Sequence, residues 1–461
     1  MKPIIVEFDN SSKEPLYIQL YTTIRDSILR GDIAHGEKLP SLRALSKSLL
    51  VSITTTQQAY NQLLVEGYIE SIPQSGYYAA QVLSGSGSET ESAPNEPLTP
   101  EIMTFDNSPQ ICDPECFDFI KWKKCATGVF NDYSHLLLSE SDPQGEYSLR
   151  FEISKYLYSS RGVKAAPEQI VIGAGTQQIT GHLCRVLDKL GVKHVSLEKP
   201  GYLPVQSMFR DYGMTISHIP VSADGIEINK LPANISSAVY VSPSNQFPTG
   251  AVMPAGSRYK LLDWAKANDS IIIEDDYDSE LRYFGRPVPA LKSLDKSDRV
   301  VYLGSFSSTL FPSIKISYMV LPYPMAQIFD QIKGQYTQTC SKAEQLTLAL
   351  FMEKGYYYTG IRRLRSLYSQ KLQAVIQGFQ DHGKGKITAK NAQSGINLIL
   401  RVRSKKSADT LCSEAKSIGL QIVPVADISD QETSALIFYY NQIPLAEINA
   451  LIMKLVLLWD I

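Results

Sequence analysis

Two apolar runs in the second half of the 461-residue chain are each followed by side chains that could do chemistry. Asp275 and Tyr277 follow the run at residues 271–273, and hydroxyls follow the run at 300–303: Ser305, Ser307 and Ser308. A carboxylate buried at a strand end is costly unless a cation accompanies it or it is protonated. A serine hydroxyl is a weak, neutral nucleophile and cannot form an imine with an aldehyde. These residues can bind a ligand through a carboxylate and hydroxyl groups, but none of them offers an amine.

A third group lies earlier in the chain, at Gly175, Thr176 and Gln177, between a strand-like run and a helical stretch. Backbone N–H groups at a helix N-terminus, helped by a threonine hydroxyl, bind phosphate well. A loop of this composition can hold a phosphate, but these residues alone do not assign one.

The elements that must position these groups are five short, β-branched runs that alternate with helical stretches after about residue 105. They read QIVIGAG, HVSLEKPGY, SAVYVSP, SIIIEDDY and RVVYLGSF. Runs of this kind are typical of strands buried on both faces of a mostly parallel sheet. The pattern predicts an α/β domain.

The segments IIIEDDYDSELRYFG, residues 271–285, and VYLGSFSSTLFPSIKISYMVLP, residues 301–322, resemble the cofactor core of fold-type-I aminotransferases. In that family the second segment reads Ser-Phe-Ser-Lys-Thr, and the lysine amine forms an imine with pyridoxal phosphate. Ser308 stands at the position of that lysine. The resemblance thus implies a pyridoxal phosphate site without covalent attachment.

The resemblance also implies a role for each neighbouring residue. Asp275 would pair with the ring nitrogen. Tyr277, together with Asn245 or Gln246, would face the ring oxygen. Tyr202 would stack near the ring, although an ordinary tyrosine at a strand end is the alternative. A solvated strand end is likewise the alternative for the three consecutive acids that include Asp275. The phosphate would be held by the following residues: Gly175, Thr176, Gln177, Ser305, Ser307 and Lys315, the last in place of the usual arginine.

The end of the chain departs from that family. Its members bind the substrate carboxylate with an arginine near the C-terminus, but no arginine follows Arg403 here. Tyr439, Tyr440 and Asn441 occupy the corresponding region. The ligand therefore need not be an α-amino acid.

The first 80 residues contain the start and stop signals of three helices. Apolar residues recur every four positions from Leu16 to Ile28, and Ser41 and Ser52 are placed to cap two further helices before Gly67. The segment YIESIPQSGYYAA then reads as two short strands around a turn. This order predicts a winged helix-turn-helix.

Residues 36–80 resemble the GntR-type winged helix through Leu-Pro-Ser-x-Arg, Val-Ser, Ala-Tyr-x-x-Leu and Glu-Gly. The resemblance implies a double-stranded DNA operator as partner, with the third helix in the major groove. Ile53 and the pair at residues 72–73 depart from the family, which commonly has basic residues there. The implied DNA contacts are Lys38, Ser41, Arg43, Ser52, Thr54, Thr55 and Gln57.

The charge of this segment is not that of a strong polyanion binder. Residues 1–80 hold seven Lys and Arg against eight Asp and Glu, so affinity from counterion release should be modest unless a dimer doubles the contacts. A winged helix that serves only protein contacts is the alternative.

We therefore expect three parts: a GntR-type winged helix at residues 13–81, a Ser/Gly/Pro-rich flexible linker at 82–102, and an aminotransferase-like domain at 103–461. The last would combine a mostly parallel sheet with a small C-terminal α+β domain from about residue 331. This fusion is the architecture of MocR-type regulators.

The resulting expectation is a transcriptional regulator that senses a small molecule, forms a homodimer and has lost catalysis. An enzyme fused to a DNA-binding domain and a large domain used only for dimerisation are the alternatives. A net charge of −2, six cysteines without metal or redox spacing and no membrane-length apolar run indicate a cytoplasmic protein without a metal site or a membrane partner.

Overall fold

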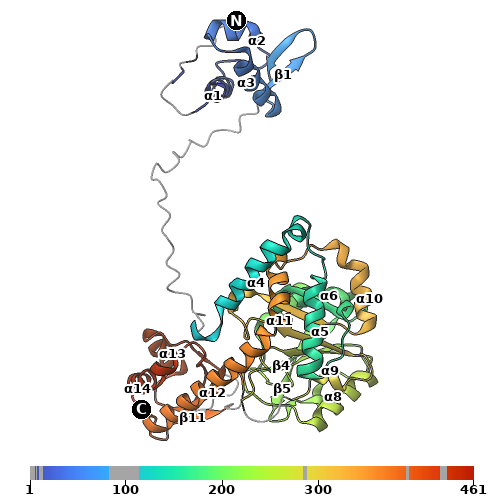
Figure 1. Ribbon diagram of the computed structural model, residues 1–461, viewed down its shortest axis with the longest axis vertical. Helices are drawn as coiled ribbons and strands as arrows, with labels where there is room; N and C mark the ends of the chain where they lie inside the picture. The colour runs from blue at the N-terminus through green and yellow to red at the C-terminus, as the bar shows by residue number, and fades with distance from the viewer. Residues whose placement is uncertain are drawn as a thin grey trace. The chain divides into compact units, whose positions relative to one another are not determined.

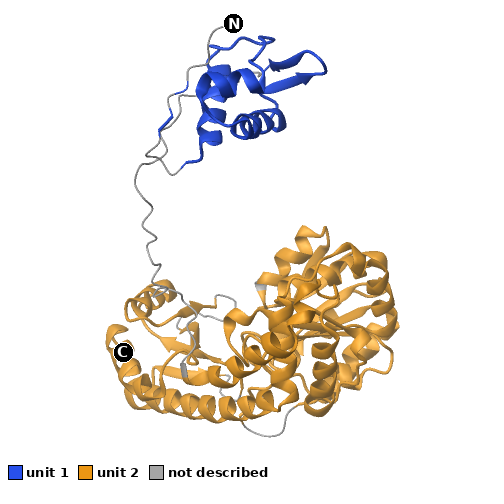
Figure 2. Cartoon of the chain, turned by 45° about the horizontal axis from the view of Figure 1, so that its top comes forward, with its two compact units in different colours: residues 1–104 blue, residues 105–461 orange. Residues whose placement is uncertain are grey.

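The computed structural model describes residues 6, 8–9, 14–81, 114–283, 288–390, 394–425 and 433–461. Two compact units make up the chain, Met1–Thr104 and Phe105–Ile461, and Figure 2 distinguishes them by colour. The linker predicted at residues 82–102 lies outside the described residues.

The first unit is the predicted winged helix-turn-helix (Figure 1). Its core is formed by apolar residues from α1 and α3, among them Leu20, Tyr60 and Leu63. The Ser41 hydroxyl accepts a hydrogen bond from the N–H of Ala44, and that of Ser52 accepts one from Thr55, so the two predicted caps are confirmed. The elements are α1 Leu16–Leu29, α2 Leu42–Leu49, α3 Ile53–Val65, and the antiparallel strands β1 Ile69–Ile72 and β2 Gly76–Ala79.

The second unit is built on an eight-stranded sheet in the order β3-β10-β9-β8-β7-β4-β5-β6. Strands β9, β8, β7, β4 and β5 run parallel to one another, whereas β10 is antiparallel to β3 and β9. All five predicted strands are confirmed as β3, β4, β7, β8 and β9. The bounds are β3 Ile170–Ala174, β4 His194–Lys199, β5 Thr215–Ser222, β6 Gly225–Ile226, β7 Ala238–Val241, β8 Ile271–Asp276, β9 Val300–Ser305 and β10 Ile316–Val320.

Helices cover both faces of this sheet, which explains why its strands are apolar on both sides. On β3, Val171 packs in the core with α6 and α7, whereas Ile170 and Ile172 pack in the core with α5 and α11. The helices are α4 Phe119–Asp132, α5 Tyr147–Arg161, α6 Thr176–Lys189, α7 Leu203–Asp211, α8 Ala255–Ala267, α9 Leu291–Leu294, α10 Tyr323–Ile332 and α11 Lys342–Glu353.

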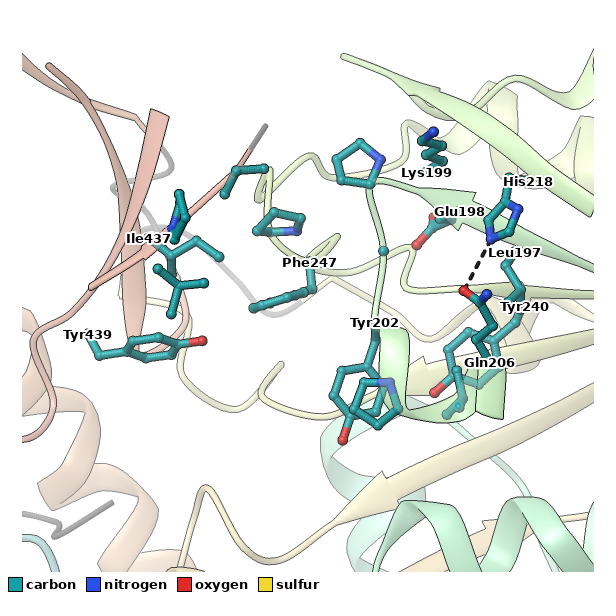
Figure 3. A pocket seen from close by; sticks show the side chains of 18 residues that line it. Leu197, Glu198, Lys199, Tyr202, Gln206, His218, Tyr240, Phe247, Ile437 and Tyr439 are labelled. Atoms are coloured by element: carbon teal, nitrogen blue, oxygen red, sulfur yellow. Dashed lines mark hydrogen bonds between the residues drawn. The ribbon is translucent and has the colours of Figure 1, made fainter. Parts of the chain in front are cut away.

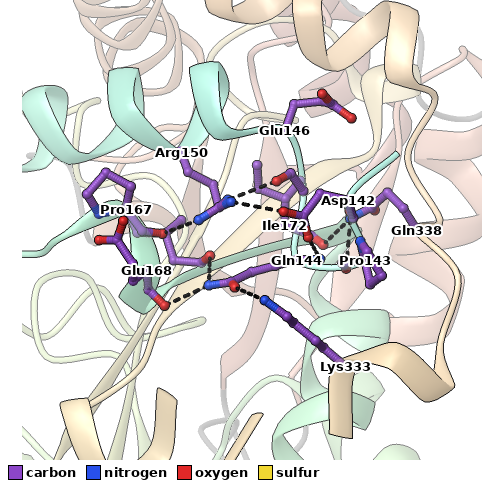
Figure 4. Close-up of polar contacts among 12 residues, drawn as sticks. Asp142, Pro143, Gln144, Glu146, Arg150, Pro167, Glu168, Ile172, Lys333 and Gln338 are labelled. Carbon is purple, nitrogen blue, oxygen red and sulfur yellow. Dashed lines mark hydrogen bonds and ion pairs between the residues drawn. The ribbon is translucent and has the colours of Figure 1, made fainter. Parts of the chain in front are cut away.

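The segment before α5 is tied to β3 by a polar network (Figure 4). The Arg150 guanidinium donates to the carbonyls of Gly145 and Pro167, both at 2.8 Å, and the Gln144 amide donates to the carbonyls of Glu168 and Ile170. This network satisfies backbone groups at the edge of the sheet.

A smaller α+β subdomain ends the chain. Its sheet is antiparallel in the order β11-β12-β14-β13, and its core includes Leu398, Phe438 and Trp459. The prediction that the small subdomain begins near residue 331 is wrong. Helix α11, which follows that residue, packs on α4 and α5, two helices that cover the large sheet. The transition lies within α12, where Tyr357 belongs to the large core and Leu372 to the small one. The elements are α12 Tyr356–His382, β11 Ile387–Lys390, β12 Asn397–Arg403, α13 Ala408–Ser417, β13 Ile422–Pro424, β14 Thr433–Tyr439 and α14 Ile448–Leu458.

Within the described ranges, no helix combines the length and the apolar character needed to cross a membrane. The described cysteines are free thiols, and four of the five are buried.

Candidate functional site

The residues predicted to hold a phosphate gather at one edge of the large sheet. Strand register places Ser317 of β10 opposite both Gly173 of β3 and Ser305 of β9. Gly175 follows β3 with φ +89° and precedes the first turn of α6, so free N–H groups of that helix face this edge. Ser305 accepts hydrogen bonds from the Ser317 hydroxyl at 3.1 Å and from the Ser307 N–H at 3.3 Å.

Ser308 lies half-buried in the turn after β9, and its side chain makes no hydrogen bond with a described residue. Lys315 is exposed, has φ +48° and forms no hydrogen bond or ion pair with the described part of the chain. The structure thus places Ser305 at the same edge as the start of α6, with β10 between its strand and β3. Lys315 makes no polar contact with the described residues there.

The three consecutive acids of β8 are all buried, so the interpretation as a solvated strand end is wrong. Glu274 accepts hydrogen bonds from the N–H groups of Leu291 and Lys292 at 2.7 and 2.8 Å. Asp276 forms a buried ion pair with Arg161 at 2.8 Å. Two of the three carboxyl groups therefore have structural partners within the fold.

Asp275 differs from both neighbours. Its side chain accepts a hydrogen bond from the Tyr240 hydroxyl at 2.5 Å and has no ion pair with a described lysine or arginine. Burial raises the pKa of Asp275 to about 7, against the lowering effect of the Tyr240 hydrogen bond. A buried acid in this state is suited to a cationic ligand group, and a pyridinium nitrogen is such a group.

The residues predicted around the ring also lie together. The Asn245 amide donates to the Tyr277 hydroxyl at 3.3 Å and to Asp278 at 2.9 Å. Phe247 meets the rings of Tyr277 and Tyr202 edge-on, with centroids 6.4 and 6.5 Å apart. Tyr202 is 39% exposed, so one side of its ring is open to a ligand.

A cavity of about 560 Å³ adjoins this group (Figure 3). Tyr202 and Tyr240 line one side, and Ile437 and Tyr439 of β14 line the side formed by the small subdomain. Of the aromatic residues at the end of the chain, Tyr439 thus reaches the cavity. Tyr440 is instead buried and donates to the carbonyl of Gly395.

Sequence reasoning missed three residues of the site. Glu198 is buried beside the cavity, Tyr240 holds Asp275, and Arg161 pairs with Asp276. Glu198 could have been found from the sequence, because it is an acid that interrupts the apolar run of β4. Tyr240 and Arg161 left no such signal, since their partners are 35 and 115 residues away.

The donor set fits a phosphorylated pyridinium compound. The N-terminus of α6 and the hydroxyls of Ser305 and Ser307 are suited to a phosphate, and Asp275 to a ring nitrogen. Position 308 is a serine and offers no amine.

In the first unit, Arg43 of α2 and Thr54 and Gln57 of α3 are exposed and available for contact. The hydroxyls of Ser41, Ser52 and Thr55 take part in capping, the last two at 2.8 Å from each other. The ammonium of Lys38 lies over the Tyr78 ring, 5.7 Å from its centroid. Of the predicted DNA contacts at α2 and α3, three side chains are therefore available to DNA and three already form hydrogen bonds at the helix N-termini.

Comparison with known proteins gives both units a family. The family of bacterial regulatory proteins named gntR matches residues 16–78, and the class I and II aminotransferases match residues 132–422. The HTH-type transcriptional regulator YdeL of Bacillus subtilis (strain 168) is 39% identical over 421 residues, 89% of each chain. The probable rhizopine catabolism regulatory protein MocR of Rhizobium meliloti is 32% identical over 437 residues, 91% of this chain and 88% of that one.

Among solved structures, a kynurenine aminotransferase of Pyrococcus horikoshii superposes with a TM-score of 0.66 and 23% identity, over 77% of this chain and 92% of that one. The winged helix and the aminotransferase fold define a DNA-binding transcriptional regulator. The chain belongs to the MocR-type regulators, in which a GntR-type winged helix is joined to a class I and II aminotransferase domain.

Proposed function

We propose that this cytoplasmic regulator binds pyridoxal phosphate reversibly in its second unit, and that the bound molecule sets the affinity of the winged helix for its operator. Two features support this proposal: Asp275 is a buried acid without an ion pair to a described lysine or arginine, and a serine, Ser308, stands at the position to which the resemblance assigns the lysine. The pocket can bind such a molecule but cannot attach it.

Each part of the ligand has a counterpart in the chain. Asp275 would hold the ring nitrogen, Tyr277 and Asn245 the ring oxygen, and Tyr202 one face of the ring. Gly175, Thr176, Gln177, Ser305 and Ser307 would hold the phosphate, with Lys315 adding charge. When bound, pyridoxal phosphate would supply an aldehyde and an electron-accepting ring.

Catalysis is absent in this proposal. Loss of a general base alone lowers rates by roughly 10²–10⁴, and the serine at position 308 has no amine that could serve as one. The C-terminal region, which has no arginine after Arg403, also lacks a bidentate clamp for a substrate carboxylate.

We further propose a homodimer, because apolar side chains stand exposed on the outer helices of the second unit. Patches of this kind mark association surfaces. A dimer would present two winged helices and so double the phosphate contacts, which matters because each winged helix has few basic residues. The exposed residues lie on α4, the 3₁₀ turn Ser134–Leu138 and α5 and are Phe119, Ile120, Phe130, Leu138, Tyr147, Phe151 and Tyr158.

The test of reversible binding is an absorbance titration of the full-length protein with pyridoxal phosphate, followed by borohydride reduction and intact mass measurement. We expect a saturable spectral change that dialysis removes, and a protein mass unchanged by reduction. A pyridoxyl adduct on any lysine of the second unit would overturn the non-covalent assignment, and no saturable binding would overturn the proposal as a whole.

A further inference from the structure

The third helix of the winged helix-turn-helix has an exposed face without any charged side chain. Helix α3 contains no lysine, arginine, aspartate or glutamate from Ile53 to Val65. Its buried side chains face the core of the first unit and are Thr56, Ala59, Tyr60 and Leu63. The opposite face is therefore the one that can meet DNA, and it does so without a cationic group.

That exposed face carries one large apolar side chain and a series of amides. Ile53, Gln57 and Asn61 follow one another at intervals of four residues, so they lie along one side of the helix. Thr54 and Gln58 are exposed beside them. The three amide side chains form no hydrogen bond with a described residue, so their donors and acceptors are available to a partner.

Ile53 contributes little to the core of the first unit. Its side chain is 50% exposed and does not pack against that core, whereas those of Leu42, Leu49 and Leu64 do. Leu50, three residues before Ile53, is 93% exposed. Two large apolar side chains thus stand in solvent where the recognition helix of a helix-turn-helix begins, and residues at that end contact the base edges.

The groups on this face match an A·T pair better than a G·C pair. In the major groove, thymine presents a methyl group that apolar side chains can contact. Adenine presents a donor and an acceptor that one Asn or Gln amide can bind together, whereas guanine presents two acceptors that suit lysine or arginine. Because α3 has amides and an isoleucine but no cation, its chemistry is complementary to adenine and thymine.

The available cations of the first unit lie elsewhere. Arg25 and Arg30 form ion pairs with neighbouring aspartates. Lys38 precedes α2, and Arg43 and Lys47 belong to it. In a helix-turn-helix the helix before the recognition helix crosses the DNA backbone, where lysine and arginine neutralise phosphates. Affinity and base preference therefore depend on different helices.

We propose that the start of α3 recognises adjoining A·T base pairs in each operator half-site, with Ile53 against a thymine methyl group and the Gln57 amide on an adenine. The two residues are about 6 Å apart along the helix, and successive base pairs are about 3.4 Å apart, so both contacts fall within adjoining pairs. The inference rests on the proposed function, because it requires the winged helix to bind operator DNA.

The test begins with full-length protein and a pool of random double-stranded DNA, from which bound sequences are selected with and without saturating pyridoxal phosphate. We expect each selected half-site to contain adjoining A·T pairs. Deoxyuridine then replaces one thymine at a time, which removes only the methyl group. At one thymine of each half-site the affinity should fall about fourfold, as for one methyl group returned to water.

The matched variants are Ile53→Ser and Val65→Ser. Val65 is 84% exposed on the same helix but lies about 18 Å further along its axis. Ile53→Ser should bind the thymine and deoxyuridine duplexes with equal affinity, whereas Val65→Ser should keep the fourfold difference. Gln57→Ala should likewise lose the preference for adenine over 7-deazaadenine, which lacks the N7 acceptor.

A deoxyuridine effect of the same size in wild-type protein and in Ile53→Ser would overturn the inference, because the methyl group would then act through another residue or through the shape of the duplex. Selected half-sites in which the contacted pairs are G·C would overturn it as well. In both cases sequence-specific binding persists, so only the base recognition is wrong. If no sequence is enriched under either condition, operator binding fails, and the proposed function fails with it.

Discussion

Neutralising two adjacent acids of β8 should change stability in opposite directions. Asp275 and Asp276 are both buried, but only Asp276 has a buried cation, the Arg161 guanidinium at 2.8 Å. In Asp275→Asn the amide oxygen can still accept from the Tyr240 hydroxyl. In Asp276→Asn the guanidinium loses its countercharge.

The direction of the stability change for Asp275→Asn follows from the pKa of Asp275, which is about 7 in the folded protein against an ordinary value of 3.8. Between these values the unfolded chain is ionised while the folded protein retains the proton. The wild-type protein therefore loses stability as pH rises from about 4 to 7. At about 1.4 kcal/mol per pH unit the full interval corresponds to about 4 kcal/mol, and we expect Asp275→Asn to recover about 2–4 kcal/mol above pH 7.

Asp276→Asn should change the stability in the opposite direction. Removing one partner of a buried ion pair leaves the other charge uncompensated and costs about 3–5 kcal/mol. Asp276→Asn should therefore destabilise the second unit at pH 7.5, where Asp275→Asn stabilises it.

Urea unfolding followed by tryptophan fluorescence measures both effects on the full-length protein. The chain has three tryptophans, Trp122, Trp264 and Trp459, all in the second unit, so the winged helix does not contribute. The measurement should be made without pyridoxal phosphate at pH 5.5 and 7.5. Equal destabilisation by both variants at pH 7.5 would refute the assignment of Asp275 as an acid without a cation.

Three further perturbations test other parts of the structure. Ser308→Lys should bind pyridoxal phosphate covalently, turn yellow and remain feeble in transamination; a colourless variant in excess cofactor would favour a domain used only for dimerisation. Arg43→Ala should abolish gel retardation of fragments near the protein's own gene and leave the oligomer intact, whereas Thr54→Ala should mainly change sequence preference; unchanged retardation by Arg43→Ala would contradict the DNA contacts. Leu138→Asp, at a side chain that is 90% exposed, should yield monomers in sedimentation, and an unchanged sedimentation coefficient would place the dimer contact elsewhere.

Local signals in the sequence were sufficient for the elements and for the strand ends. Ser41 and Ser52 cap their helices as predicted, because capping depends only on residues within one turn. The five apolar runs form strands because burial on both faces requires continuous apolar sequence. The acid, the serines and the glycine loop then meet at one edge because of the order of the strands.

Long-range partners could not be predicted in this way. The bond between Tyr240 and Asp275 and the pair of Arg161 with Asp276 join segments whose separation in sequence carries no local pattern. The start of the small subdomain was misplaced for the same reason, since α12 is one continuous helix that passes from one core to the other.

The central claim is that a ligand in the second unit controls DNA binding by the first. Fluorescence anisotropy of a labelled operator fragment, with and without saturating pyridoxal phosphate, tests it directly, and Asp275→Asn serves as the control that should bind the ligand weakly. We expect the operator affinity of the wild-type protein to change at least about fivefold and that of the variant to stay constant. Identical operator affinities of the wild-type protein with and without bound pyridoxal phosphate would contradict the account.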